Sequence, residues 1–383
     1  MIRRLFIAST LAVFSLSAWA QFGGPTHEIR VVTVAEGFVN PWSIAWLPGG
    51  DMLVTERGGT IRVVRDGNVS LPIDNVPAVR ASQQGGLFDV VLHPDYEDNG
   101  WLYISFAKPD ADNNESATTV IRARLEDHAL VDIEEVFEAK AWSNSGAHFG
   151  GRIVFDGQGH MFISSGERGA PTGGDPYQHP AQLTDNHFGV IVRLNDDGSV
   201  PADNPFVGVD GFEPEIWSYG HRNPQGMVWD AENERLWLTE HAPQGGDELN
   251  LAEPGKNYGW PVIGYGANYG SGTELHATRY HEGMEQPKAF WVPSIATSGL
   301  ALVTGDEFPN WEGNLLAGGL SADHGRISRV TLAADGTVSG RYPMLMQEYR
   351  IRDVRQGPDG YIYIAVDSRG TDQTPILRIE NAD

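Results

Sequence analysis

Four polar segments of this chain carry the kinds of side chain that catalysis most often uses. They span residues 148–152, 166–169, 220–226 and 240–248, and they combine histidines, arginines, carboxylates and glycines. Each segment lies just before or just after a pattern typical of a short β-hairpin. Because loops that flank rigid hairpins often hold binding and catalytic groups, we expect these segments to line one shared site.

His148 and Glu167 form a candidate acid–base pair, because one hairpin separates them and both are expected at the same end of a sheet. A carboxylate that accepts a hydrogen bond from one imidazole nitrogen fixes the tautomer and raises the basicity of the other. Such a pair takes a proton from a hydroxyl group. The alternatives are that His148 is a structural hydrogen-bonding residue and that Glu167 caps a turn.

Arginines supply the candidate anion contacts. Arg222 and Asn223 precede a Pro-Gln-Gly segment, and Arg350 and Arg352 stand at alternate positions before the last hairpin. Alternate residues of a strand share one face, and guanidinium groups offer planar donor pairs to carboxylate or quinone-type oxygens. The pattern indicates an anionic ligand or buried acids. An Arg222 that bridges loops, and a solvated Arg350–Arg352 pair, are the alternatives.

The acidic loop 240–248 and the Gln84 turn are less specific. Carboxylates and backbone carbonyls in one loop suit calcium, although the EF-hand spacing is absent, so metal binding and a capped surface turn fit equally well. Gln84 precedes two glycines and either brings an amide to a ligand or begins a strand.

The elements that must position these groups recur along the chain. An apolar run, a turn of Asp, Asn, Gly or Pro and a second apolar run appear at residues 46–55, 91–104, 154–163, 228–238, 307–316 and 356–364. Six such units predict an all-β fold, a six-bladed β-propeller of four-stranded antiparallel blades. We expect residues 375–380 to pair with residues 28–33 and close the ring. Residues 126–140 fit a short helix or a strand and turn.

Composition limits the function classes. The 383-residue chain has no cysteine and a net charge of −24, which excludes thiolate chemistry and opposes binding to nucleic acid or anionic lipid. Residues 1–20 have the charged, apolar and small-residue regions of a cleavable signal peptide, so we expect a periplasmic or secreted protein without a membrane span, with residues 21–383 as one domain. Dinucleotide-binding and Gly-x-Ser-x-Gly motifs are absent from the sequence.

Four motifs together carry a family resemblance. They are His-x-x-Gly-Arg at 148–152, Arg-Asn-Pro-Gln-Gly at 222–226, the acidic loop with Asn-Tyr-Gly-Trp-Pro at 257–261, and Arg-x-Arg-Asp-Val at 350–354. In this order they resemble the soluble aldose sugar dehydrogenases that use pyrroloquinoline quinone, the glucose/sorbosone dehydrogenase family. The resemblance runs from residue 41 to residue 360.

The resemblance implies a six-bladed propeller that binds pyrroloquinoline quinone and calcium above its central channel. It implies that His148 takes the proton of the sugar C1 hydroxyl, that Glu167 orients His148 and that Arg222 stabilises negative charge on the quinone oxygen. The implied cofactor contacts are Gln84, His148, Arg222, Asn223, Asp247, Arg350 and Arg352. The implied calcium ligands are the carbonyls of Ala242 and Pro243, with Glu240 and Asn250 at a second, structural calcium.

The chain departs from the family pattern at two positions. Ser321 stands where the family has a lysine, for which Arg326 is the expected replacement, and the acid is Glu167 rather than an aspartate. The function expected is oxidation of an aldose sugar at C1 to the lactone, with an electron acceptor that the residues do not identify. The alternatives are a calcium-dependent propeller lactonase or esterase and a non-catalytic binding propeller.

Overall fold

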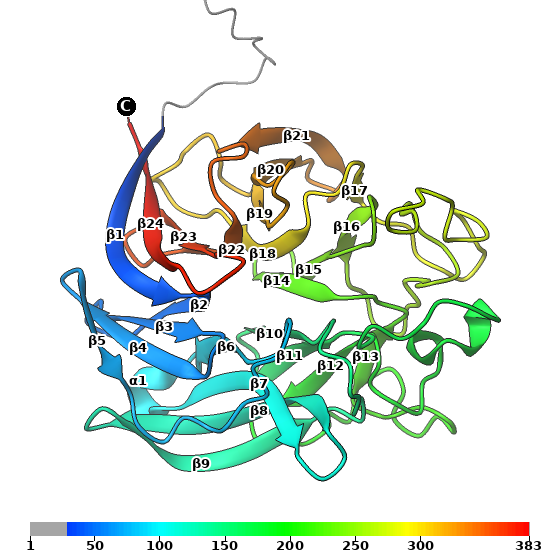
Figure 1. Ribbon diagram of the computed structural model, residues 1–383, viewed down its shortest axis with the longest axis horizontal. Helices are drawn as coiled ribbons and strands as arrows, with labels where there is room; N and C mark the ends of the chain where they lie inside the picture. Colours follow the sequence, from blue (N-terminus) through cyan, green and yellow to red (C-terminus); the bar gives the residue numbers. More distant parts are fainter. Residues whose placement is uncertain (1–28, 383) are drawn as a thin grey trace, which may run out of the picture.

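Six four-stranded antiparallel sheets stand around a central axis in the computed structural model, which describes residues 29–382 (Figure 1). Five blades use four strands that are consecutive in sequence, and the sixth combines three C-terminal strands with the first strand of the chain. The predicted six-bladed propeller is therefore confirmed.

The strands of the first three blades are β2 (Pro41–Trp46), β3 (Met52–Glu56), β4 (Thr60–Arg65) and β5 (Asn68–Pro72); β6 (Leu87–Leu92), β7 (Leu102–Asp110), β8 (Glu115–Glu126) and β9 (Ala129–Glu138); and β10 (Gly150–Phe155), β11 (His160–Ser165), β12 (Val190–Asn195) and β13 (Ile216–Tyr219). Those of the last three are β14 (Pro224–Asp230), β15 (Arg235–Glu240), β16 (Asp247–Leu251) and β17 (Ala289–Trp291); β18 (Thr297–Leu302), β19 (Leu315–Gly319), β20 (Ile327–Leu332) and β21 (Val338–Met344); and β22 (Ile351–Gln356), β23 (Ile362–Val366), β24 (Gln373–Asn381) and β1 (Ile29–Val39).

Apolar residues on both faces of the blades hold neighbouring sheets together. One core cluster packs Tyr103 and Val120 of the second blade against Ile153 and Ile163 of the third. All four side chains are fully buried. Burial on both faces explains why these strands appear in the sequence as nearly continuous apolar runs rather than as strict alternations.

The ring closes by pairing the two ends of the described chain. In β1 and β24, Arg30 pairs with Glu380 and Val31 with Ile379. This agrees with the closing pair expected from the sequence, although Glu28 lies outside the described residues. Residues 126–140 form the end of β8, a turn and β9, so the strand alternative is correct there and the helix is not.

Two arginines and two aspartates from the innermost strands fill the centre of the ring. Arg152 Nη1 lies 3.3 Å from Asp89 Oδ1, and its Nη2 lies 3.0 Å from Asp353 Oδ1. Arg355 contacts the same two acids at 2.6 Å and 2.9 Å. Arg152 is a β10 residue of the third blade and Asp353 a β22 residue of the sixth, so this neutral network ties blades across the axis.

The antiparallel order of each blade decides where the polar segments meet. The innermost strand begins, and the second strand ends, at the same end of every blade. His148 precedes innermost strand β10, and Glu167 follows second strand β11. Arg222 likewise precedes β14, residues 240–248 begin where second strand β15 ends, and Arg350 precedes β22. All four polar segments and Arg350 therefore reach one end of the propeller.

In the part of the chain that the structure describes, helical structure is confined to short turns. These are α1 (Tyr96–Asn99) and two 3-10 turns, η1 (Pro176–Gln178) and η2 (Pro180–Gln182). Within residues 29–382 no helix is long and apolar enough to cross a membrane. The expected signal peptide at 1–20 lies outside the described residues, and the single domain at 21–383 stays a prediction.

Candidate active site

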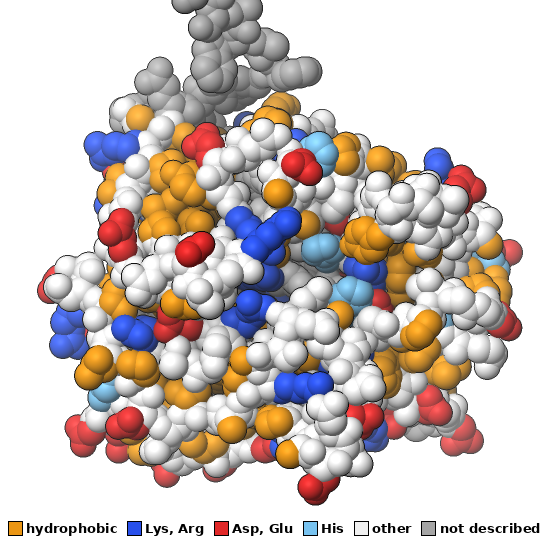
Figure 2. Space-filling view, in the orientation of Figure 1, with side chains coloured by type: hydrophobic (Ala, Val, Ile, Leu, Met, Phe, Trp, Pro, Cys, Tyr) orange, Lys and Arg blue, Asp and Glu red, His pale blue; other side chains and the backbone are white. Residues whose placement is uncertain are grey.

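A funnel of about 890 Å³ opens at the end of the ring where the polar segments meet. Figure 2 shows arginine or lysine and histidine side chains gathered around a hollow near the middle of this face. Its charged and imidazole lining residues are Arg57, His241, Asp323, His324, Arg350, Arg352, Asp367 and Arg369. Four guanidinium groups face two carboxylates, so the funnel is cationic although the whole chain is strongly acidic.

His148 and Glu167 are hydrogen-bonded to each other. His148 Nδ1 lies 2.7 Å from Glu167 Oε1, and 14% of the His148 side chain is exposed against 2% of Glu167. The second carboxylate oxygen of Glu167 accepts from the Ala170 amide at 2.8 Å. This geometry fixes an Nδ1-protonated imidazole whose Nε2 is left to accept a proton.

The electrostatics of the pair suit a neutral base. Burial lowers the pKa of His148, and the Arg222 guanidinium lowers it further, while Glu167 opposes both effects. Burial disfavours the charged form of Glu167, but the charge and hydrogen bond of His148, with Arg222, outweigh it and lower the pKa of this carboxyl. At neutral pH the pair therefore consists of a neutral imidazole and a carboxylate.

Arg222 and Asn223 each leave one donor nitrogen unsatisfied. Arg222 Nη1 donates to the His241 carbonyl at 2.5 Å, and its Nε lies 3.9 Å from Glu167 Oε1. Asn223 accepts from the Gly150 amide at 3.1 Å. Within the described chain, Arg222 Nε and Asn223 Nδ2 are buried without a hydrogen-bond partner.

Arg350 and Arg352 share one acid, Asp367. Arg352 Nη2 lies 3.0 Å from Asp367 Oδ2, and Arg350 Nε lies 3.8 Å from the same oxygen. Arg352 also donates to Gln225 Oε1 at 2.8 Å, and Arg350 donates to the Leu320 carbonyl. Burial lowers the pKa of Arg350 to about 10, and the neighbouring cations Arg352, Arg369 and Arg57 contribute to the shift.

Gln84 lines the funnel and supports His148. Its side-chain Oε1 accepts from the His148 backbone amide at 3.0 Å, and its backbone amide donates to the Gly146 carbonyl at 2.9 Å. The side-chain amide of Gln84 thus presents its nitrogen, rather than its oxygen, for further contacts. Gln84 thus contacts His148 and shares the funnel with Arg57, Arg350, Arg352 and Arg369, the four residues that we call the arginine wall.

Asp247 lies beneath the acidic loop rather than in the funnel lining. Its Oδ1 accepts from the Ala242 amide at 2.9 Å, and its Oδ2 accepts from Ser294 Oγ and the Ala296 amide, each at 2.7 Å. Burial raises the pKa of Asp247 to about 6, against the effect of these hydrogen bonds. This carboxylate braces the loop that presents the carbonyls of Ala242 and Pro243.

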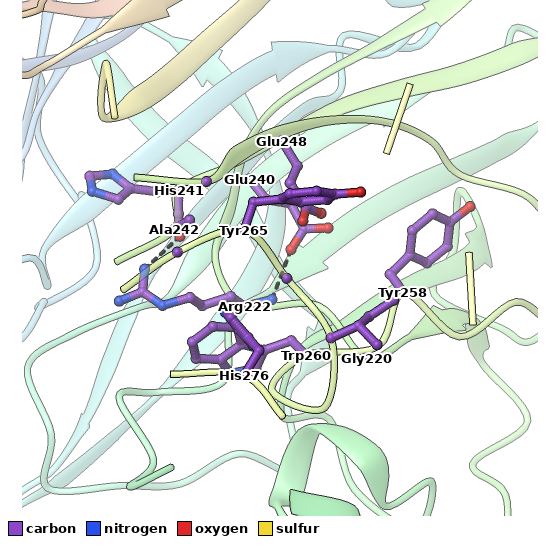
Figure 3. Close-up of a pocket in the computed structure, with 14 residues that line it drawn as sticks. Gly220, Arg222, Glu240, His241, Ala242, Glu248, Tyr258, Trp260, Tyr265 and His276 are labelled. Carbon is purple, nitrogen blue, oxygen red and sulfur yellow. Dashed lines mark hydrogen bonds between the residues drawn. The ribbon is translucent and has the colours of Figure 1, made fainter. Parts of the chain in front are cut away.

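Glu240 and Glu248 line a second, narrow pocket, and Asn250 lies behind them. Asn250 Nδ2 donates to Glu240 Oε1 at 3.0 Å and to Glu248 Oε2 at 3.1 Å, and Figure 3 shows the two glutamates side by side. Glu240 also accepts from the Arg222 backbone amide at 2.8 Å, and its Oε1 lies 2.5 Å from His221 Nδ1. Burial and the charge of Glu240 raise the pKa of Glu248 to about 8. Carboxylate and amide oxygens of this kind are ligands that suit calcium.

The donors around the funnel suit an anionic ligand. Four nitrogens in or beside it are buried without a hydrogen-bond partner in residues 29–382. His241 Nδ1 and Arg350 Nε belong to the funnel lining, and Arg222 Nε and Asn223 Nδ2 belong to the loop before β14. Buried polar groups are rarely left unpaired, so this set indicates a ligand with several acceptor oxygens. A flat tricarboxylate quinone has that chemistry.

The sequence pattern missed several funnel residues. Arg57, Asp367 and Arg369 line the funnel, whereas Arg326 does not. The hairpin register could have found them, because they lie just after the second strand of a blade. Arg57 directly follows β3 and Asp367 follows β23, in the same way that Arg168 follows β11 and His241 follows β15. Ser321 lines the funnel at the position expected for the family lysine.

Comparison with known proteins agrees with this geometry. The family model described as glucose/sorbosone dehydrogenase matches residues 38–378. Aldose sugar dehydrogenase YliI of Escherichia coli is 40% identical over 372 residues, which cover 95% of this chain and 96% of that protein. Quinoprotein glucose dehydrogenase B of Acinetobacter calcoaceticus is 27% identical over 457 residues, with 97% and 94% covered.

A solved structure shows the same fold with a cofactor. The PQQ-bound form of aldose sugar dehydrogenase from Streptomyces coelicolor superposes with a TM-score of 0.72 at 30% identity, covering 93% of this chain and 99% of that one. The family match spans all six blades and every polar segment of the site. The chain therefore belongs to the glucose/sorbosone dehydrogenase family.

Proposed function

We propose that this protein oxidises aldose sugars at C1 to the corresponding lactones with pyrroloquinoline quinone as its cofactor. The observation that carries the proposal is the His148–Glu167 hydrogen bond of 2.7 Å, made next to Gln84, a residue that lines a cationic funnel. A base held beside a site for a flat anion is the arrangement that oxidation of a hydroxyl group requires. The relatives named above support the substrate class and the cofactor.

His148 is the base in this proposal. Its Nε2 takes the C1 hydroxyl proton, while Glu167 holds Nδ1–H and stabilises the imidazolium that results. Arg222 lies beside the pair, with its Nη1 on the His241 carbonyl, and offers its free Nε–H to negative charge that develops nearby.

The arginine wall and the amide groups would hold the cofactor. The guanidinium groups of Arg350 and Arg352 suit the carboxylates of the cofactor, and Gln84 and Asn223 offer amide nitrogens from the loops before β6 and β14. When bound, pyrroloquinoline quinone supplies a carbonyl carbon that accepts the C1 hydrogen with its electron pair. The carbonyls of Ala242 and Pro243 would hold a calcium ion beside it, and Glu240 and Asn250 a second, structural calcium.

The proposed location is the periplasm or the cell exterior, because residues 1–20 have the pattern of an export signal. An exported dehydrogenase of this kind would pass its electrons to an acceptor outside the cytoplasm.

Reconstitution tests the function. Purified apo protein is mixed with calcium and pyrroloquinoline quinone, an aldose is added, and reduction of an electron-accepting dye is followed together with the product lactone. Dye reduction that needs all three additions supports the proposal. Lactone hydrolysis without dye reduction would instead identify a lactonase, and cofactor-independent sugar binding alone would identify a non-catalytic propeller.

A further inference from the structure

Arg168 is a fully buried arginine whose guanidinium holds the loop before β10. Its Nε donates to the Ala147 carbonyl at 3.1 Å, and its Nη1 donates to the carbonyls of Ser116 at 2.6 Å and Ala141 at 3.1 Å. Its Nη2 donates to the Ser145 carbonyl at 2.6 Å. Only 1% of the residue is exposed. One planar group thus joins three points of this loop to β8.

The loop carries His148 in a conformation that needs support. The φ angle of His148 is 49°, in the left-handed region that is unfavourable for a non-glycine residue. Its carbonyl accepts from the Arg168 amide at 3.1 Å, and its amide donates to Gln84. A Cβ on Gly166 would lie 2.3 Å from the same carbonyl, so the turn that carries Arg168 packs directly on His148.

The guanidinium is also a cation close to the imidazole. Its hydrogen bonds described above all go to neutral carbonyl oxygens, and it lies over the Phe149 ring with Cζ 3.6 Å from the centroid. Burial lowers the pKa of Arg168 to about 9, which leaves it charged at neutral pH. After burial and Arg222, Arg168 is a further cause of the low pKa of His148.

We propose that Arg168 is a positioning residue for the base, fixing the left-handed backbone of His148 and keeping a positive charge behind the imidazole without touching substrate or cofactor. The proposal rests on the proposed function for the role of His148. Arg168 is not among the implied cofactor contacts, and its guanidinium nitrogens donate to backbone carbonyls of β8 and of the loop before β10.

The charged and titratable groups around His148 decide the direction in which its pKa should move in the Arg168 variants. Glu167 raises the pKa of His148, and Arg222 and Arg168 lower it. His241 lies within electrostatic reach of the same ring. Removing the Arg168 charge should therefore raise the pKa of His148.

The test compares Arg168→Gln and Arg168→Lys with the wild type. For both variants kcat should fall about 10- to 100-fold, because small displacements of a reacting group are that costly. KM and the Kd for pyrroloquinoline quinone, measured by titration of the apo protein, should stay unchanged. In Arg168→Gln the acidic limb of kcat/KM should move to higher pH. The lysine variant has the aliphatic stem and the charge but lacks the planar fork.

Arg329→Lys is the matched control. Arg329 is also a buried arginine, 6% exposed and lying over the Trp311 and Tyr342 rings, but it belongs to β20 in the fifth blade. It should lose thermal stability and retain wild-type kcat and pH profile. A wild-type kcat in Arg168→Lys, or an unmoved acidic limb in a folded Arg168→Gln, would overturn the proposal.

A measurement on the apo protein separates this proposal from the proposed function. Nitrogen NMR of histidine-labelled protein, with His148 assigned by its His148→Asn variant, reports the tautomer and pKa of the ring without cofactor or sugar. Arg168→Gln should raise that pKa and weaken the Nδ1–H signal, whereas an unchanged His148 would refute the positioning role. Failure of the loaded wild type to oxidise aldoses would refute the proposed function alone.

Discussion

The imidazole of His148 and the carboxylate of Glu167 lie 2.7 Å apart, next to Gln84 in the lining of a funnel that also carries four arginines. Glu167 makes a second hydrogen bond, from the Ala170 amide, that fixes its own orientation. The His148 imidazole is therefore held by a carboxylate that the turn itself positions.

Replacing the base should abolish most turnover. We expect His148→Asn to lower kcat about 10²–10⁴-fold, the usual contribution of general base catalysis, because no other group holds the same position. Steady-state kinetics with cofactor-saturated enzyme measures this, and cofactor titration should show binding retained. His128→Asn, at an exposed turn between β8 and β9, is the control and should behave as wild type. A His148→Asn enzyme with wild-type turnover would refute the assignment.

Replacing the orienting acid should move the pH profile in the opposite direction to Arg168→Gln. Glu167 raises the pKa of His148, so Glu167→Gln should lower it, and the acidic limb of kcat/KM should move to lower pH. Turnover should also fall about 10-fold or more, because the tautomer of His148 is no longer fixed. A pH–rate series from pH 5 to 9 checks both effects, and an acidic limb that moves upward would contradict the pairing.

The arginine wall should dominate cofactor affinity. A charge-assisted hydrogen bond is worth about 1.5–3 kcal/mol, so Arg352→Gln should weaken binding of pyrroloquinoline quinone about 10- to 100-fold. Titration of apo protein at two salt concentrations measures it, and the loss should be smaller at high salt. Arg30→Gln removes the same charge from the outer strand β1 and should leave affinity unchanged. Equal effects of the two substitutions would mean that net charge, not contact, is responsible.

The brace under the acidic loop should control calcium binding. All three Asp247 partners described above are hydrogen-bond donors. In Asp247→Asn a side-chain NH2 group replaces one carboxylate oxygen, so a donor would face another donor. We expect about 10-fold weaker calcium binding, measured calorimetrically in the presence of cofactor, since the loss of one to two hydrogen bonds costs about 1–2 kcal/mol. Asp230→Asn, a buried aspartate at the opposite end of β14, is the control. Equal calcium affinity in all three proteins would refute the role of Asp247.

The central ion network should matter for stability rather than for chemistry. Arg152→Met leaves Asp89 and Asp353 facing only Arg355, and removing one partner of a buried ion pair costs about 3–5 kcal/mol. Urea denaturation of the apo protein measures the change in the free energy of unfolding. A loss below about 1 kcal/mol would show that the network contributes little to holding the blades together.

Much of the fold could be predicted because it depends on local periodicity. Each hairpin repeats the same turn chemistry between apolar runs, and six repeats with paired ends suffice to predict a closed ring. The ends of the hairpins also predicted which side chains meet, since antiparallel strands return the chain to the same end. His148 and Glu167 followed from one hairpin alone.

The hairpin register places Arg57 and Asp367 at the same end of the ring as the polar segments, but it does not predict which charged groups each of them meets. Asp367 is 15 residues from Arg352, and its role depends on the side-chain direction at the end of β23. Arg57 reaches the same funnel from the first blade, nearly three hundred residues away in sequence. Such contacts depend on how the blades are arranged around the axis, which no local pattern contains.

The sequence by itself determined the strand repeats, the residue types at the end of each hairpin and the family. Only the tertiary structure decided that Asp247 is buried under its loop, that Arg168 holds the loop of His148 and that four donor nitrogens stay unpaired around the funnel. The physical reason is that burial and pairing depend on packing between blades. The same arginine or aspartate is a solvated charge at one place and a fixed, desolvated one at another.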